Sequence, residues 1–274
     1  MHLTSVKTIK EILRIHQIKP NKGLGQNFLI DSRAIHRLIS AAHLGQEDTV
    51  LEIGPGLGTL TQELARRARH VIAIEKDAKM VEILKETLIN FKNIEVIHGD
   101  ALKIEYTRYN IQNTGYKVVA NLPYYITAPV IRKFLELQQK PQQMTLIIQK
   151  EVAQRICAKP PQMSILAVSV QVYATPKIIS YIKKTSFWPQ PMVDAAILQI
   201  TPLSTSYAQD FPKFFTVVKA GFKQPRKQLV NNLSTGLELP REKVGQWLLS
   251  NNIHPTQRAE TLGIQDWINL ANML

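Results

Sequence analysis

The sequence contains a single cysteine, Cys157, and no long run of apolar residues. One cysteine excludes an internal disulfide and a cysteine-built zinc cluster, and it is typical of a reducing compartment. No stretch of about 18 apolar residues occurs, and charged residues are spread through the first twenty positions, so neither a transmembrane helix nor a secretory signal is predicted. We therefore expect a cytoplasmic protein without a membrane partner.

Metal-ligand patterns are also missing. The seven histidines show no pair at the spacing of a helical metal site and have no cysteine companions. The sequence therefore predicts no metal site.

Acidic residues are fewer than basic ones. The 274 residues include 34 lysines and arginines against 21 acidic residues, a formal net charge of +13. Seven of the basic residues lie between positions 140 and 190, where Glu151 is the only acid. A surface of this sign attracts polyanions, so nucleic acid is the expected partner.

Apolar strand patterns alternate with helical patterns up to about residue 160. Short β-branched runs, typical of buried strands, occur at 49–53, 70–75, 93–98, 117–121 and 144–149, and helical patterns at 58–68, 77–90 and 126–139. Strands separated by helices predict an α/β fold with a doubly wound parallel sheet.

The pattern changes towards the carboxyl terminus. Residues 164–174 fit a helix or a strand, whereas 177–182 and 194–200 indicate an antiparallel strand pair that closes the sheet. After Pro202 only helical patterns follow. We expect a first domain over residues 1–205 and a small all-helical domain over residues 206–274.

A glycine loop follows the first buried strand. Gly54, Gly56 and Gly58 stand between strand and helix, where glycine lets the backbone approach a ligand closely. Thr59 occupies the place of the last glycine in a dinucleotide fingerprint, which argues against a dehydrogenase. Glu75 ends the next strand and is placed to bind the ribose hydroxyls of an adenosine cofactor.

Two further loops lie at the same predicted sheet edge. Asp100 follows the third strand and is placed to accept from an adenine amino group. The fourth strand leads into Asn121-Leu122-Pro123-Tyr124. A weakly nucleophilic exocyclic amine needs acceptors for both of its N–H groups, which the Asn121 side chain and the Leu122 carbonyl can supply. Pro123 stiffens this loop, and Tyr124 offers a face for stacking a flipped base.

Five segments in order resemble the KsgA-type (RsmA) small-subunit ribosomal RNA adenine dimethyltransferases: GQNFL (25–29), LEIGPGLGTLT (51–61), GDAL (99–102), NLPYYI (121–126) and SFWPQPMVDAAI (186–197). The resemblance implies a Rossmann-like class I methyltransferase domain that includes a basic amino-terminal helix, followed by a helical RNA-binding domain. It implies an enzyme that uses S-adenosyl-L-methionine to dimethylate two adjacent adenosines in the 3′-terminal hairpin of 16S ribosomal RNA. We expect the protein to be a monomer. The expected substrate is a small-subunit precursor, and the expected role is in ribosome biogenesis.

Carried over by position, the resemblance implies a set of cofactor contacts: Asn27, Leu29, Gly54, Gly56, Glu75, Asp100 and Asn121. It also implies that Phe187 and Pro189 clamp the target base against Tyr124. We expect basic side chains to contact the RNA backbone, namely Lys150, Arg155, Lys183 and Lys184. Met192 stands where the family usually has lysine, and Pro225 where it often has arginine.

Three other functions compete with this interpretation. Erm-type large-subunit ribosomal RNA methyltransferases share the same loops, although the forms of NLPYYI and GQNFL favour the small-subunit enzymes. A non-enzymatic RNA or DNA binder is a second alternative, against which the intact Asn121 and glycine loop argue. A DNA adenine methyltransferase would be expected to carry a large target-recognition domain.

Overall fold

The computed structural model describes residues 2–106, 115–204 and 210–274. It divides into two compact units, one made of Met1–Ala153 with Lys177–Pro202 and the other of Gln154–Pro176 with Leu203–Leu274. The boundary predicted between residues 205 and 206 lies outside the described residues. Residues 154–176 belong to the second unit, although the sequence analysis assigned them to the first domain.

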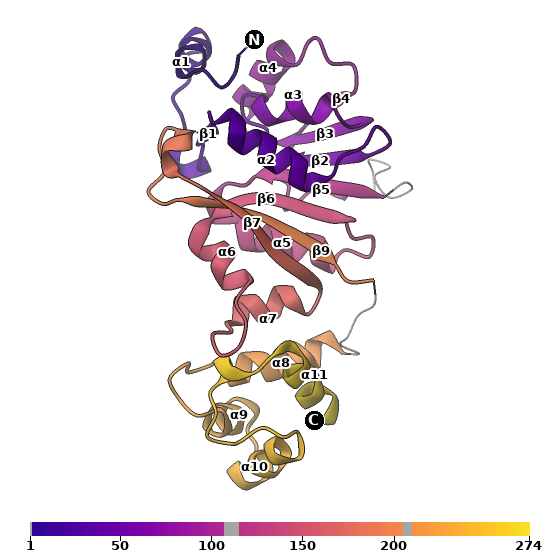
Figure 1. Cartoon of the computed structure of the whole chain (residues 1–274), viewed down its shortest axis with the longest axis vertical. Coiled ribbons are helices and arrows are strands. Elements are labelled where there is room, and N and C mark those ends of the chain that lie inside the picture. Colours follow the sequence, from indigo (N-terminus) through magenta and orange to yellow (C-terminus); the bar gives the residue numbers. More distant parts are fainter. Residues whose placement is uncertain (1, 107–114, 205–209) are drawn as a thin grey trace. The chain divides into compact units, whose positions relative to one another are not determined.

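The first unit is built on a seven-stranded sheet with the strand order β4-β3-β2-β5-β6-β9-β7 (Figure 1). Strands β4, β3, β2, β5 and β6 pair in parallel, and β9 joins β6 in the antiparallel sense. The bounds are β2 Thr49–Ile53, β3 His70–Glu75, β4 Ile94–His98, β5 Tyr116–Asn121, β6 Gln143–Gln149, β7 Ala174–Ile182 and β9 Ala195–Pro202. The predicted α/β class and the predicted strand pair are both confirmed.

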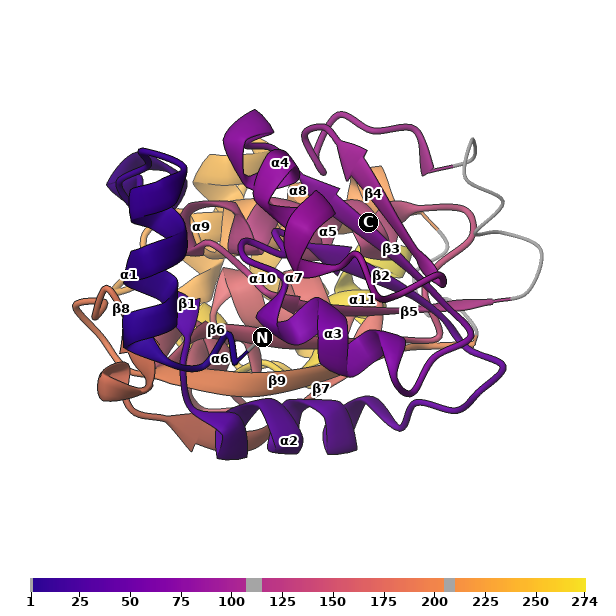
Figure 2. The same ribbon diagram turned by 90° about the horizontal axis from the view of Figure 1, so that it is seen from above.

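Helices α3, α4 and α5 connect parallel strands, and each begins close to its predicted position. Helix α2 starts after the N-cap Asp31, whose carboxylate accepts the N–H groups of Arg33 and Ala34. The bounds are α2 Ser32–Ala42, α3 Thr59–Ala65, α4 Ala78–Thr87, α5 Thr127–Glu136 and α6 Lys150–Ile156, with a 3-10 turn η3 at Tyr124–Ile126. Figure 2 shows α2 running alongside the β9 end of the sheet.

The central strands are covered on both faces, which explains their nearly continuous apolar sequences. Val50 and Leu51 point to opposite faces of β2, and both are fully buried. Val50 belongs to a core cluster that includes Leu38 of α2 and Leu64 of α3. These two helices therefore pack on one face of the sheet.

The amino-terminal segment belongs to the first unit and packs against its other elements. Helix α1 (Val6–Ile15) buries Ile9 and Leu13 in a cluster with Phe28 and Met80. Strand β1 (Phe28–Leu29) pairs with β8 (Phe187–Trp188) in a separate antiparallel sheet, preceded by the 3-10 turns η1 (Lys22–Leu24) and η4 (Lys184–Ser186) respectively. Two of the sequence segments that carry the family resemblance are therefore neighbours in space.

The second unit is predominantly helical. Its helices include α7 Ile165–Gln171, α8 Phe211–Gly221, α9 Leu229–Leu237, α10 Arg241–Ser250, η5 Ala259–Thr261 and α11 Ile264–Met273. The prediction of helices after Pro202 is therefore confirmed for the described residues. The ring of Tyr173, just after α7, stacks on Phe211 of α8 at 4.4 Å between centroids. This contact explains why residues 154–176 group with the carboxyl-terminal helices. Within the described ranges, no helix is both long enough and apolar enough to cross a bilayer.

Candidate functional site

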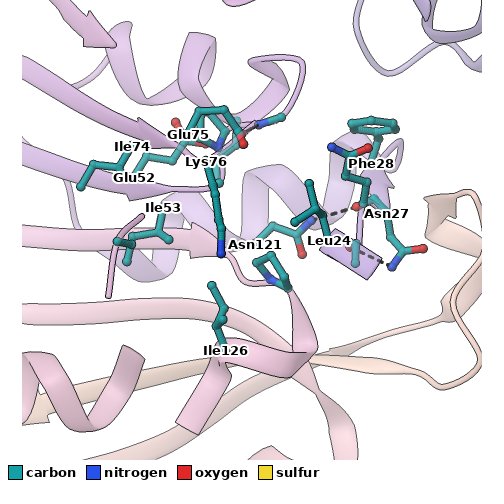
Figure 3. A pocket seen from close by; sticks show the side chains of 18 of the residues that line it. Leu24, Asn27, Phe28, Glu52, Ile53, Ile74, Glu75, Lys76, Asn121 and Ile126 are labelled. Atoms are coloured by element: carbon teal, nitrogen blue, oxygen red, sulfur yellow. Dashed lines mark hydrogen bonds between the residues drawn. The ribbon is translucent and has the colours of Figure 1, made fainter. Parts of the chain in front are cut away.

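A cavity of about 280 Å³ opens at the carboxyl ends of β2, β3, β4 and β5. The segments around residues 24–29, 53–56, 99–102 and 121–126 all contribute to its lining. Open α/β sheets bind ligands at this edge, because the loops that leave neighbouring parallel strands converge there. Figure 3 shows Glu52 and Glu75 close together at the strand ends and Asn121 directed toward Asn27.

The glycine loop lines this cavity with backbone in the left-handed region. Gly54 and Gly56 have φ angles of +68° and +59°, which side-chain-bearing residues rarely adopt. A Cβ at Gly56 would also lie 3.3 Å from a ring carbon of Phe28. The loop therefore needs glycine both for its conformation and for its close approach to Phe28.

Glu75 is fixed at the end of β3. Its Oε2 accepts the Gly56 N–H (3.1 Å) and its Oε1 accepts the Asp77 N–H (2.8 Å). Burial raises the pKa of this carboxyl, and the backbone N–H groups of Asp77, Gly56 and Lys76 oppose that rise. Because a carboxylate oxygen has two lone pairs, each oxygen retains capacity for one ligand hydroxyl.

Asp100 lies across the cavity from the glycine loop, after β4. Its Oδ1 accepts the Leu102 N–H (2.9 Å), and its Oδ2 pairs with the Lys76 ammonium (3.0 Å). Partial burial disfavours the charged form, but these two partners outweigh burial and hold the pKa of Asp100 below its ordinary value. The group is therefore an ionised hydrogen-bond acceptor.

Glu52 is a pocket residue that the sequence analysis did not assign. It lies on β2, is 1% exposed and lines the cavity, and its Oε2 has no hydrogen-bond partner among the described residues. Burial raises the pKa of Glu52 to about 8, and the nearby charge of Glu75 adds to the rise. A charged residue inside an otherwise apolar strand, two positions before Gly54, is the sequence signal that identifies it.

Asn121 ends β5 at the centre of the site. Its Nδ2 donates to the backbone carbonyl of Asn27 (3.1 Å), which fixes the side chain and directs its carbonyl oxygen away from that contact (Figure 3). Pro123 packs between two glycines, since a Cβ on Gly25 or Gly54 would come within 3.2 Å or 3.7 Å of it. The GQNFL segment and the NLPYYI segment are therefore joined by a hydrogen bond and by packing of Pro123.

The GQNFL segment also contacts the residues that follow β3. The Gln26 side chain donates to Asp77 Oδ2 (3.0 Å), and both Asn27 and Leu29 line the cavity. These contacts join residues some 50 to 94 positions apart in the chain. No local pattern in the sequence predicts such long-range contacts. For this reason only the family resemblance assigned this loop to the cofactor site.

The predicted base-binding residues differ in accessibility. Tyr124 is half-buried on η3, and burial, with a smaller effect from the charge of Asp194, raises its pKa to about 12. The Leu122 side chain is buried. Tyr125 and Ile126, which were not predicted as site residues, line the cavity, whereas Leu122 and Tyr124 are not among its lining residues.

Phe187 is packed in the core. Its side chain is 4% exposed and belongs to the apolar cluster that contains Leu29 and Ile35. Phe187 therefore has no open ring face for a base in this conformation, contrary to the expectation that it clamps the target. Pro189 is half-buried in the same segment.

The predicted RNA-contacting residues fall in both units. Lys183 and Lys184 are exposed after β7, and Lys150 is half-buried after β6, all in the first unit. Arg155 is exposed on the part of α6 that belongs to the second unit. No group of three or more potential metal-ligating side chains occurs within the described ranges.

Comparison with known families gives a match over most of the chain. Residues 17–274 match the family model described as ribosomal RNA adenine dimethylase. A curated relative from Dehalococcoides mccartyi, named ribosomal RNA small subunit methyltransferase A, is 41% identical over 263 residues, which are 95% of this chain and 90% of the relative. A relative of the same name from Alkaliphilus oremlandii is 40% identical over 99% of this chain and 98% of its own.

Solved structures give the same picture of the fold. A dimethyladenosine transferase from Plasmodium falciparum is similar with a TM-score of 0.77 and 26% identity, over 89% of this chain and 95% of that one. The 23S rRNA methyltransferase ErmE is similar with a TM-score of 0.74 and 27% identity, over 90% and 99%. The sheet described above is therefore the Rossmann-like sheet of methyltransferases.

Proposed function

The chain belongs to the ribosomal RNA adenine dimethylase family, and from that membership we propose that it dimethylates two adjacent adenosines in the 3′-terminal hairpin of 16S ribosomal RNA. The enzyme is an rRNA adenine dimethyltransferase. The substrate is a small-subunit precursor, the enzyme acts as a monomer, and the modification belongs to small-subunit biogenesis.

The cavity fits S-adenosylmethionine as cofactor. Glu52 has a buried oxygen without a partner, which suits a cationic ligand, and Glu75 retains acceptor capacity for two hydroxyls. Gly54 and Gly56 line the cavity with backbone at positive φ angles, a conformation that glycine adopts readily. When bound, this cofactor supplies a methyl group activated by a sulfonium centre.

Each loop at the sheet edge has a role in cofactor binding. Glu75 holds the ribose, and Asp100 accepts from the adenine amino group. Gly54 and Gly56 let the backbone approach the ligand closely. Asn27 and Leu29 complete the wall, because the hydrogen bond from Asn121 holds their segment in place.

The residues of the NLPYYI loop handle the methyl acceptor. The Asn121 carbonyl and the Leu122 backbone carbonyl accept the N–H groups of the target amine and thereby localise its lone pair. Tyr124 stacks on the flipped adenine, and its raised pKa keeps the phenol neutral at physiological pH. No strong base is required, because the proton can leave to water after the methyl group has arrived.

RNA binding uses the basic residues around this loop. Lys150, Lys183 and Lys184 of the first unit contact backbone phosphates, and in the second unit Arg155 and the carboxyl-terminal helices also bind RNA. Pro189 borders the base site. Phe187 supports that site from the core, in keeping with its burial.

The observation that carries this proposal is the hydrogen bond from Asn121 to Asn27 (3.1 Å), because it fixes an acceptor oxygen beside a cofactor-sized cavity. The test is transfer of labelled methyl groups to small subunits that lack this modification, with large subunits and naked DNA in parallel. We expect incorporation approaching four methyls per small subunit and none on the other substrates. Labelling of large subunits would instead assign an Erm-type target, and binding without transfer would assign an assembly factor.

A further inference from the structure

Acidic side chains predominate on one half of the sheet edge and basic side chains on the other. Glu52, Glu75 and Asp100 line the half formed by β2, β3 and β4. On the other half, Lys150 follows β6, and Lys183 and Lys184 follow β7. Because β9 runs antiparallel to β6 and lies between β6 and β7, the end of β6 lies beside the start of β9. The acidic half suits a cationic cofactor, and the basic half suits a polyanion.

Large apolar side chains are exposed on the basic half. On the edge strand β7, alternate residues point outward, and among them Ile179 and Tyr181 are 36% and 50% exposed. In the loop before β9, Met192 is 90% exposed and Val193 is 44% exposed. Exposed apolar side chains beside lysines suit a ligand that has both flat apolar faces and negative charge.

Asp194 joins the segments that form this surface. Its backbone carbonyl accepts the Lys150 N–H (3.0 Å), and its Oδ1 accepts the Lys184 N–H (3.0 Å). The Lys150 ammonium in turn lies 5.2 Å from the centre of the Tyr181 ring. The same Asp194 charge acts on Tyr124, so this surface borders the loop that receives the target base.

We propose that Tyr181 and Lys150 form a stacking platform for an unpaired RNA base next to the target adenosine. The inference rests on the proposed function, since it assigns the binding position of the nucleotide that flanks the reacting one. Lys150 covers one side of the ring and pairs with the phosphate, while the exposed part of the ring stacks on the base. A protein partner would gain less here, because the surrounding lysines favour an anion.

The test compares variants of the full chain in equilibrium binding to a labelled small-subunit 3′ hairpin and to oligoadenylate. We expect Tyr181→Ala to weaken binding of both RNAs about tenfold, and Tyr181→Phe to bind like the parent chain, because stacking needs the ring and not the hydroxyl. The salt dependence should be unchanged in both variants. Lys150→Met should reduce the slope of log affinity against log salt by about 0.7 to 0.9, the value for one phosphate contact.

Ile89→Ala is the matched control, because Ile89 is 77% exposed in the same unit but precedes β4 at the opposite end of the sheet. Thermal melting and cofactor affinity of every variant establish that the fold and the cavity are intact. The stacking role of Tyr181 would be refuted if Tyr181→Ala bound RNA with the affinity of the parent chain. It would also be refuted if Tyr181→Ala and Tyr181→Phe lost RNA affinity equally.

Loss of binding to intact small subunits with normal binding to both RNAs would also overturn the platform, since it would assign the surface to a protein partner. Failure of the proposed function has a different signature. In that case the parent chain would not methylate small subunits, while the oligoadenylate arm would still report on Tyr181.

Discussion

The ammonium group of Lys133 donates to the carbonyl oxygen of Leu102 at 2.8 Å, and thereby joins helix α5 to the loop that carries Asp100. It also donates to the carbonyl oxygens of Ala101 (3.2 Å) and Ile104 (2.9 Å), so three backbone acceptors surround one ammonium. Helix α5 follows the NLPYYI loop directly. One side chain therefore fixes the adenine side of the cavity relative to the methyl-acceptor side.

Lys133→Met should weaken S-adenosylmethionine binding about tenfold, because the Asp100 loop loses three charge-assisted hydrogen bonds. Calorimetry gives the dissociation constant directly. Arg132→Met is the control, since Arg132 is the neighbouring cation on α5 and forms an ion pair with Glu136 (2.8 Å). Equal affinities in the parent chain and Lys133→Met would refute the positioning role.

Asn121→Ala should reduce methyl transfer at least a hundredfold, the usual effect of removing one preorganised hydrogen-bonding group from a transition state. Cofactor affinity should remain within a few fold, because Glu75 and Asp100 are untouched. Single-turnover transfer and calorimetry separate the two effects. Unchanged turnover would remove the NLPYYI loop from the mechanism.

Glu75→Ala should weaken cofactor binding by about ten- to a hundredfold, as expected for the loss of charged hydrogen bonds to two hydroxyls. The substitution also releases the N–H groups of Gly56 and Asp77 from their acceptor. Glu82→Ala is the control, because Glu82 pairs with Lys85 on the exposed face of α4. A dissociation constant equal to that of the parent chain would exclude a ribose contact at Glu75.

Glu52 should make the folded state less stable as pH rises. Its pKa is about 8 in the folded state and near 4.5 without burial, so between these values the unfolded chain ionises while the folded chain retains the proton. The free energy of unfolding should therefore fall by up to about 1.4 kcal/mol per pH unit across this window. Above pH 8 the full penalty is present, and below pH 4.5 it is absent.

Glu52→Gln should remove this slope, which urea denaturation at pH 5, 6.5 and 8 measures. Glu95→Gln is the control, because Glu95 is exposed on β4. The same ionisation predicts that a cationic cofactor binds more tightly as pH approaches 8 and releases a proton on binding. Parallel pH profiles for the parent chain and Glu52→Gln would contradict the assignment.

Local sequence patterns predicted the parts of the site that strand ends supply. Glu75 and Asp100 each follow a recognisable strand, so the parallel arrangement brings them to one edge without further information. The helical segments after Pro202 were also predicted by spacing alone. Each of these features depends on residues close together in the chain.

Long-range contacts could not be predicted from the same patterns. The contact of Gly25 with Pro123 and the hydrogen bond between Asn27 and Asn121 join segments about a hundred residues apart. The sequence alone fits Phe187 equally well to a base clamp or to a core position, and its packing beside Leu29 depends on a segment far away in the chain. The grouping of residues 154–176 likewise follows from the stacking of Tyr173 on Phe211.

The order of strands in the sheet has an evolutionary consequence. The cofactor loops leave the parallel strands β2, β3, β4 and β5, whereas the exposed residues of β7 and of the loop before β9 lie beyond β6. Substitutions on the outer strands, or in the loop that holds Met192, can therefore accumulate without disturbing the cavity. Such a sheet can acquire a new RNA target while inheriting its cofactor chemistry unchanged.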